Sequence, residues 1–192
     1  MLERQTTYGR GVGLKAAGRP RKVPFGAGPI EALCPQCGLC CNGVLFADVE
    51  LRKSDRTSAL EKLGLAVFKR GRHRVFAQPC GCFDGRHCAI YEDRPTHCQA
   101  FECGLLQRVS AGKLTAAAAL KTIAQAKRKV ARVESLLQKL GEEDASPALT
   151  ERYVAAMSAP VDLASNHGPD HQGQLMRQMG ELMELLEVKF RT

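Results

Sequence analysis

The sequence predicts an α+β protein that is mainly α, in which a small, loop-rich cysteine module packs with C-terminal helices. Three observations support this fold class. All nine cysteines of the 192-residue chain lie between residues 34 and 103, among glycines, prolines and short apolar runs. After residue 105, apolar residues recur at three- and four-residue steps, the period of an amphipathic helix. Aromatic residues are only 5% of the chain and tryptophan is absent, so the core is expected to be aliphatic and modest in size.

We expect three regions along the chain. Residues 1–30 are predicted to be a basic flexible arm, because they are rich in glycine, proline and arginine. They hold six basic side chains against one acid, Glu3, and so carry most of the net charge of +8. Residues 31–105 are the predicted cysteine-cluster metal-binding module. Residues 106–192 are the predicted helical C-terminal region.

The sequence further predicts a cytoplasmic protein with no membrane contact. No apolar run approaches the roughly 18 residues of a membrane-spanning helix. The basic N-terminus is not followed by the apolar stretch of a secretory signal. In a reducing compartment, thiols at short spacing are more often metal ligands or catalytic groups than disulfide partners.

Short elements are expected within the cysteine module, where turn residues separate brief apolar runs. In chain order these are a turn-rich loop at 34–43, a strand at 44–46, a helix capped by Asp48 that includes Val49 and Leu51, a helix at 58–63 ended by Gly64, and a hairpin in which 67–68 and 75–76 flank a basic turn.

The C-terminal region is predicted to contain three helices. The longest spans 113–140 and ends at Gly141. Ser146 and Pro147 predict the cap and first turn of a second helix that reaches Met157. After a loop at 159–173, a last helix carries an apolar face of leucine and methionine that ends at Phe190. We interpret this face as core or helix-pairing surface.

The first cysteine group is Cys34-Pro-Gln-Cys37-Gly38-Leu-Cys40-Cys41. Two-residue gaps allow successive thiolates to converge on one metal, and Gly38 can supply the unusual φ that such a loop needs. Adjacent side chains diverge, so Cys40 and Cys41 can hardly face one simple tetrahedral ion. The pair indicates a polynuclear centre, two separate sites, or one ligand beside a spare thiol.

The second cysteine group lies forty residues downstream and adds five thiols: Cys80, Cys82, Cys88, Cys98 and Cys103. A single zinc or iron–sulfur site with four cysteine ligands uses four thiolates. The nine thiols of the chain are about twice that number, which makes two centres or one larger cluster plausible.

The two groups together resemble the YkgJ-type cysteine-cluster proteins, which are described as a zinc- or iron-chelating domain with a CxxCxxCC signature. The resemblance covers about residues 31–105. It is carried by the first group with Gly38, and downstream by Cys80, Cys88, Ile90, Tyr91, Arg94, Pro95, Cys98, Phe101 and Cys103. Gln99, Gly81 and Cys82 depart from the usual pattern, and Cys82 is an extra thiol.

The resemblance implies metal binding but no settled activity. The implied ligands are Cys34, Cys37, Cys40, Cys41, Cys80, Cys88, Cys98 and Cys103. Some proteins with a similar cluster act in protein lysine methylation, notably on flagellin. The glycines of the arm lack the strand–loop–helix context of a methyl-donor site.

Residues beside the ligands are expected to tune the centre. Pro95 pushes Arg94 out of helical geometry, which places its cation beside the thiolates or makes it a partner for a nearby acid. Tyr91 is expected to be core packing with a tethered hydroxyl. His87 and His97 each precede a cysteine, and either could complete a mixed site.

Several functions fit these features. We favour an iron–sulfur or iron centre with a redox, sensing or accessory role in protein modification. The main alternative is a zinc-stabilised binding module, whose arm and helices contact a protein or, with weaker support, a nucleic acid. A metal-free thiol enzyme or redox switch would need an activated cysteine, and none stands out. An oxidised disulfide scaffold would require export. No hydrolase motif is present, and whether the protein is an enzyme stays open.

Overall fold

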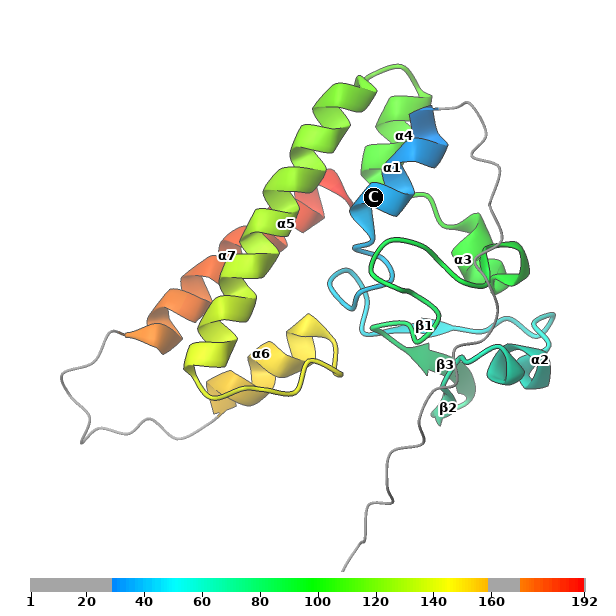
Figure 1. Cartoon of the computed structure of the whole chain (residues 1–192), viewed down its shortest axis with the longest axis horizontal. Helices are drawn as coiled ribbons and strands as arrows, with labels where there is room; N and C mark the ends of the chain where they lie inside the picture. Colours follow the sequence, from blue (N-terminus) through cyan, green and yellow to red (C-terminus); the bar gives the residue numbers. More distant parts are fainter. Residues whose placement is uncertain (1–28, 159–169, 192) are drawn as a thin grey trace, which may run out of the picture.

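The computed structural model describes residues 29–158 and 170–191. The predicted arm lies outside these residues, apart from its last two positions. Within the described part, seven α-helices, one 3-10 helix and a three-stranded antiparallel sheet confirm the predicted α+β, mainly α class. The long helices lie on one side of the molecule and the sheet on the other (Figure 1).

The helical side is built on α5 (Ala116–Lys139) and α7 (His171–Lys189), which pack along each other. Both were predicted, with small differences at their ends. Helix α5 begins at 116 because the Thr115 hydroxyl accepts a 3.2 Å hydrogen bond from the Ala118 amide. Helix α7 begins at His171, inside the segment predicted as loop, because Asp170 accepts a 2.7 Å bond from the Gly173 amide.

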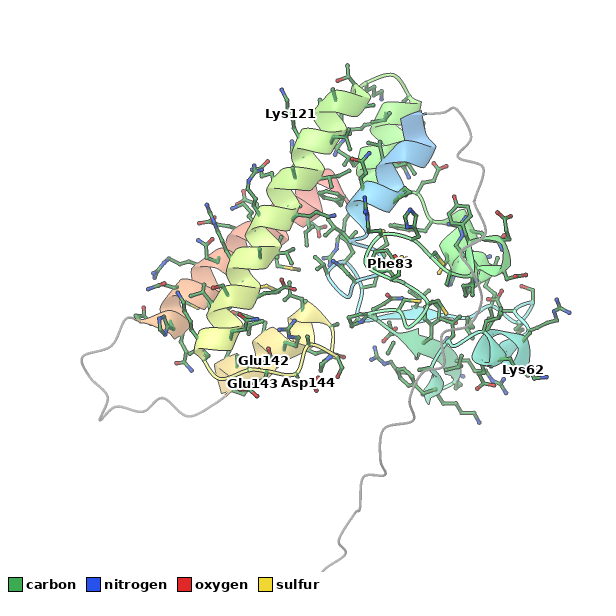
Figure 2. All side chains as sticks on the ribbon, viewed as in Figure 1. Lys62, Phe83, Lys121, Glu142, Glu143 and Asp144 are labelled. Carbon is green, nitrogen blue, oxygen red and sulfur yellow. The ribbon has the colours of Figure 1, made fainter. Side chains whose placement is uncertain are left out.

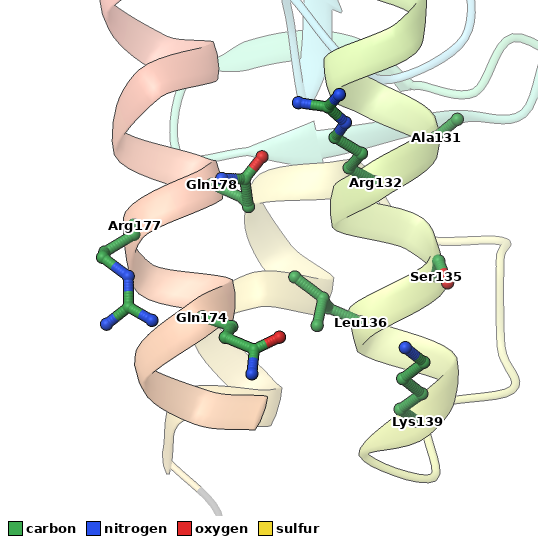
Figure 3. A pocket seen from close by; sticks show the side chains of 8 residues that line it. All are labelled: Ala131, Arg132, Ser135, Leu136, Lys139, Gln174, Arg177 and Gln178. Carbon is green, nitrogen blue, oxygen red and sulfur yellow. The ribbon is translucent and has the colours of Figure 1, made fainter. Parts of the chain in front are cut away.

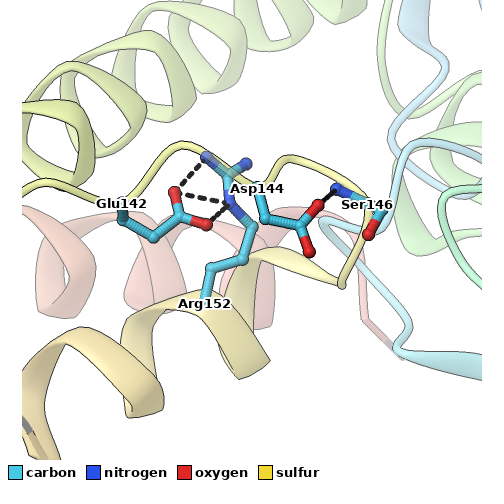
Figure 4. A network of polar contacts seen from close by, with 4 residues as sticks. All are labelled: Glu142, Asp144, Ser146 and Arg152. Atoms are coloured by element: carbon cyan, nitrogen blue, oxygen red, sulfur yellow. Dashed lines mark hydrogen bonds and ion pairs between the residues drawn. The ribbon is translucent and has the colours of Figure 1, made fainter. Parts of the chain in front are cut away.

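Helix α6 (Leu149–Ser158) is shorter than predicted and crosses below α5 and α7. Ser146 is not its cap, because the Ser146 amide donates to Asp144 within the preceding loop (2.9 Å). The first turn is instead tied by Glu151, which accepts a 3.3 Å bond from the Ala148 amide. Buried Arg152 donates to Glu142 at 2.8 Å and so fixes α6 to the end of α5 (Figure 4).

The sheet side contains β1 (Asp48–Glu50), β2 (Val67–Arg70) and β3 (His73–Ala77), with β3 in the centre. The hairpin of β2 and β3 was predicted, as was α2 (Thr57–Lys62) with Gly64 after its end. Strand β1 pairs with the other side of β3 and places Val49 opposite Phe76.

Two of the predictions for residues 44–51 are wrong. Residues 44–46 form no strand, because Val44 and Leu45 are buried against the long helices rather than in the sheet. Asp48 does not cap a helix: it opens strand β1 and forms an ion pair with Arg70. Backbone pairing with β3, which is distant in sequence, therefore decides the conformation here.

Two groups of buried side chains form the interior. The helical core joins α1 (Pro29–Cys37), α4 (Gly104–Ser110), α5, α6 and α7, and runs from Leu33 to Phe190. The smaller sheet core contains Leu51, Leu60, Leu65, Phe76, Cys82 and Ile90. No helix within residues 29–158 and 170–191 combines the length and the apolar character that crossing a membrane requires.

Candidate metal centre

The first cysteine group begins on helix α1 and continues into a tight turn. Cys34 and Cys37 lie in the last turn of α1, whereas the sequence predicted a loop throughout 34–43. The helix ends at Cys37, and the next residue, Gly38, has a φ of +71° and donates a 3.1 Å hydrogen bond to the Cys34 carbonyl. The Cys41 amide then donates to the Gly38 carbonyl at 2.9 Å. The predicted need for a glycine at position 38 is confirmed.

Position 38 is also crowded. A Cβ at this position would lie 2.6 Å from Cζ of Phe83, a residue of the second cysteine segment. The Phe83 side chain lies between the helices and the sheet (Figure 2). Gly38 therefore serves both the turn and the close approach of the two cysteine segments.

The second cysteine group is spread over several short elements. Cys80 follows β3, and Cys88 forms an isolated bridge with Phe83. Cys98 lies in α3 (Thr96–Ala100), which follows the 3-10 helix η1 (Tyr91–Asp93). Cys103 directly precedes α4 with extended backbone angles. Each element contributes one thiol, so the position of every thiol depends on tertiary packing.

Helix α3, which carries Cys98, is held by a residue far away in sequence. The Asp55 carboxylate accepts hydrogen bonds from the Thr96 amide (3.0 Å) and the Thr96 hydroxyl (2.6 Å). Partial burial acts to raise the pKa of Asp55, but the bonds from Thr96 lower it overall. Sequence reasoning missed Asp55, because a separation of 41 residues leaves no local pattern.

One cavity of about 730 Å³ brings the predicted ligands together. It lies between the helical core and the sheet core, and apolar side chains from both contribute to its walls, among them Leu45, Phe76 and Phe190. All eight predicted ligands line it: Cys34, Cys37, Cys40, Cys41, Cys80, Cys88, Cys98 and Cys103.

The ninth thiol, Cys82, does not line this cavity. It is buried in the sheet core, where its thiol donates a 3.3 Å hydrogen bond to the Leu63 carbonyl at the end of α2. Its neighbours indicate a packing role for the extra thiol.

The thiols suit a soft metal, but they are not yet in ligand positions. A zinc–sulfur bond of about 2.3 Å requires sulfurs about 3.8 Å apart in a tetrahedral site. No group of three or more histidine, cysteine or acidic side chains in the described part of the chain is arranged so that it could hold a metal ion as it stands. The donors fit zinc or iron in kind and number, and binding must draw the side chains together.

Burial raises the pKa of several thiols around the cavity, which favours their neutral form. It does so for Cys37, to about 11, and for Cys41 and Cys98, to about 12. Other cysteines add to the effect. For Cys37 they are Cys103 and Cys34, whereas for Cys41 they are Cys80, Cys88, Cys98 and Cys34, in that order.

Arg94 brings a cation to the same cavity. Its guanidinium stacks 3.8 Å from the centre of the Tyr91 ring and donates to the Tyr91 carbonyl (2.9 Å) and the Cys98 carbonyl (3.4 Å). Burial raises the pKa of Cys34, Cys88 and Cys98, and Arg94 acts in the opposite direction on each. The Tyr91 side chain is exposed rather than in the core, because it covers the Arg94 cation.

Both histidines that precede cysteines line the cavity. His97 Nδ1 lies 2.6 Å from the Glu50 carbonyl oxygen, so this nitrogen is engaged with β1. His87 Nδ1 lies 3.9 Å from the Asp84 carboxylate. The Asp84 carboxylate also accepts the amides of Arg86 (2.8 Å) and His87 (2.6 Å), which shapes the turn before Cys88.

The comparisons with known proteins give one result. The family model CxxCxxCC, whose description is "Putative zinc- or iron-chelating domain", matches residues 33–129. The match includes every cysteine and continues into α5, beyond the residues that carry the sequence resemblance. Neither the curated proteins nor the solved structures gave a match. The family match covers half of the chain, and the protein belongs to the CxxCxxCC family of zinc- or iron-chelating domains.

Proposed function

We propose that this protein binds iron, most simply as an iron–sulfur cluster, through the eight thiols of its central cavity, and uses the centre for redox chemistry, sensing or an accessory step in protein modification. The observation that carries the proposal is the convergence of eight thiols, from five separate segments, on one cavity of about 730 Å³. Thiols that served only to fill the core would be expected at scattered buried positions, as Cys82 is, and not around one shared cavity.

The chemistry of the cavity supports a thiolate-ligated metal. Neutral thiols with raised pKa values become thiolates when a metal binds, because the metal replaces the proton on sulfur. The apolar walls then keep water away, and the low dielectric strengthens the metal–thiolate bonds. Arg94 offsets part of the negative charge that several thiolates bring. Eight thiols exceed the four of a single closed zinc site, so the cavity offers enough ligands for a polynuclear centre or for a second centre.

A second candidate is a zinc-stabilised binding module whose partner docks elsewhere. A groove of about 520 Å³ between α5 and α7 supports this candidate. Three basic side chains, Arg132, Lys139 and Arg177, line it together with polar Gln174 and Gln178 (Figure 3). Such a lining suits acidic groups on a protein or a nucleic acid.

Elemental analysis and a visible spectrum of the full chain, purified without oxygen, test the first proposal. Iron with labile sulfide and a broad thiolate-to-iron band would support it. Colourless protein with one or two zinc ions per chain would replace it with the second candidate, because zinc has no d–d or charge-transfer colour. Protein with neither metal, after reconstitution with each, would overturn both.

The second candidate is tested by the salt concentration at which the chain elutes from heparin, a polyanion. Replacement of either Arg132 or Arg177 by alanine should lower this concentration more than Lys121→Ala, which removes one positive charge from α5 outside the groove. Deletion of residues 1–28 separates the contribution of the basic arm. Equal elution of the groove variants and Lys121→Ala would remove the support from the groove.

A further inference from the structure

The adjacent thiols Cys40 and Cys41 lie at the border between the two cores. Cys40 packs against the helical core, as do Cys37 and Cys103. Three other cavity thiols pack against the sheet core: Cys80, Cys88 and Cys98. No cysteine packs against both, so the two cores already divide six of the eight thiols into two groups of three.

Cys41 belongs with the thiols of the sheet core. The Cys80 amide donates a 2.8 Å hydrogen bond to the Cys41 carbonyl, which fixes the two residues next to each other. Cys80 packs against the sheet core together with Cys88 and Cys98, so this backbone contact assigns Cys41 to the same side.

Cys34 belongs with the thiols of the helical core. It precedes Cys37 by three residues on α1, and residues three apart lie on the same helix face. Cys37 packs against the helical core together with Cys40 and Cys103, so the shared helix face assigns Cys34 to the same side.

We propose, on the basis of the metal-binding function above, that the cavity holds two separate centres with four cysteine ligands each. Cys40 and Cys41 are ligands of different centres. The helical-side centre consists of Cys34, Cys37, Cys40 and Cys103. The sheet-side centre consists of Cys41, Cys80, Cys88 and Cys98.

This division interleaves the two cysteine groups of the sequence. Each centre takes ligands from both groups, so neither can be completed by the CxxCxxCC segment alone. Four thiolates are the full ligand set of a zinc ion or of an iron–sulfur cluster. Arg94 lines the same cavity and donates a 3.4 Å hydrogen bond to the Cys98 carbonyl, which places a cation beside the sheet-side centre.

The division is tested with Cd²⁺, a thiolate-binding ion, and alkylation of the thiols that remain free. The reduced, metal-free full chain is prepared as Cys98→Ser and as Cys37→Ser, loaded with one equivalent of Cd²⁺ and mapped by mass spectrometry. Cys98→Ser should leave Cys41 reactive and Cys103 protected. Cys37→Ser should give the opposite pattern, with Cys103 reactive and Cys41 protected.

The obvious alternative assigns one centre to each sequence group. In that case, Cys98→Ser would leave Cys103 reactive and Cys41 protected, which would overturn the proposal. Loss of protection at all cavity thiols in both variants would also overturn it, because it would mean one shared polynuclear centre. Full protection of the cavity thiols in either variant would show that the substituted cysteine is not a ligand.

Two controls keep these outcomes separate from other failures. Wild-type protein that protects no thiol with two equivalents of Cd²⁺ would overturn the metal-binding function itself, whereas protection with the wrong partners would overturn only the division. Circular dichroism must show wild-type helix content. Where Cys98→Ser does not fold, Cys88→Ser removes a ligand of the same centre and carries the same expectation.

Discussion

The Asp55 carboxylate holds Thr96 by two hydrogen bonds, to its amide and its hydroxyl, across 41 residues of sequence. Asp55 follows β1, and Thr96 opens the helix that carries Cys98. The contact acts as a helix cap supplied by another segment, and it links the sheet to one wall of the thiol cavity.

Replacement of Asp55 by alanine should therefore loosen α3 and weaken metal binding. A lost cap costs about 1 kcal/mol, which urea unfolding of the metal-free chain can measure. Because the pKa of Asp55 is lowered on folding, its contribution is present above the ordinary carboxyl pKa and is lost as the pH falls through the folded value. Alkylation of Cys98 reports how firmly α3 is held, and Asp55→Ala should increase its rate. Asp84→Ala, which also removes an acid that accepts backbone amides, should leave this rate unchanged.

Gly38→Ala should destabilise the protein more than Gly141→Ala. Both glycines have positive φ, +71° and +82°, and an L-residue there costs about 1–2 kcal/mol. Only at Gly38 would the new Cβ meet another atom, Cζ of Phe83 at 2.6 Å. Chemical denaturation compares the two, and Phe83→Leu in the Gly38→Ala background should recover part of the difference. Equal losses would mean that the Phe83 ring moves aside without cost.

The metal-free chain should lose stability as the pH rises above about 9. The pKa of Cys37 is raised to about 11 and those of Cys41 and Cys98 to about 12, so the folded state resists losing these protons while the unfolded chain releases them near 9. The contribution of these thiols to stability is therefore fully present below about pH 9 and is lost as the pH rises through their folded-state pKa values. Urea midpoints at several pH values measure the decline, and Cys41→Ser should reduce its slope.

Cys82→Ala should leave the metal content unchanged while it lowers stability. The Cys82 thiol is buried, does not line the cavity and is bonded to the Leu63 carbonyl, so its removal costs about 1 kcal/mol and no ligand. Cys98→Ser is the matched change, because it removes a cavity thiol and should lower the metal content. A Cys82 variant that lost metal would make the ninth thiol a ligand.

Arg94→Ala should weaken metal affinity by about tenfold, the lower end of what the loss of a residue beside the ligands costs. Without the guanidinium, the thiols of Cys34, Cys88 and Cys98 lose a cation that favours their ionised form. Competition with a chelator of known affinity measures the change. Arg86→Ala, which removes another cavity-lining cation, should lower the metal affinity less. Arg94→Lys should restore only part of the affinity, because lysine keeps the charge but not the stacking on Tyr91.

Sequence reasoning reached furthest where the signal is local. The long helix α5, the hairpin of β2 and β3, and the turn at Gly38 follow from periodicity and from residue chemistry within a few positions. The spacing of the cysteines also identified the family and the eight candidate ligands, and the structure places these eight thiols around one cavity.

It failed where distant segments decide the conformation. The local pattern of residues 44–51 predicted a strand at 44–46 followed by a helix. Pairing of β1 with β3 instead makes residues 48–50 the strand. The contact of Asp55 with Thr96 and the packing of Phe83 on Gly38 leave no trace in local spacing. The proposed assignment of thiols to two centres has the same origin, because it rests on packing against the two cores and not on sequence order.

The cavity wall includes Phe190, whose carbonyl accepts a 2.9 Å hydrogen bond from the Gly104 amide, next to Cys103. Arg191 also donates to the Leu45 carbonyl, so the end of α7 reaches back to the first cysteine segment. During synthesis, every cysteine leaves the ribosome well before this wall exists. If the thiols bind metal as proposed, we expect that the ion can reach them before α7 has folded and the Phe190 part of the wall is in place.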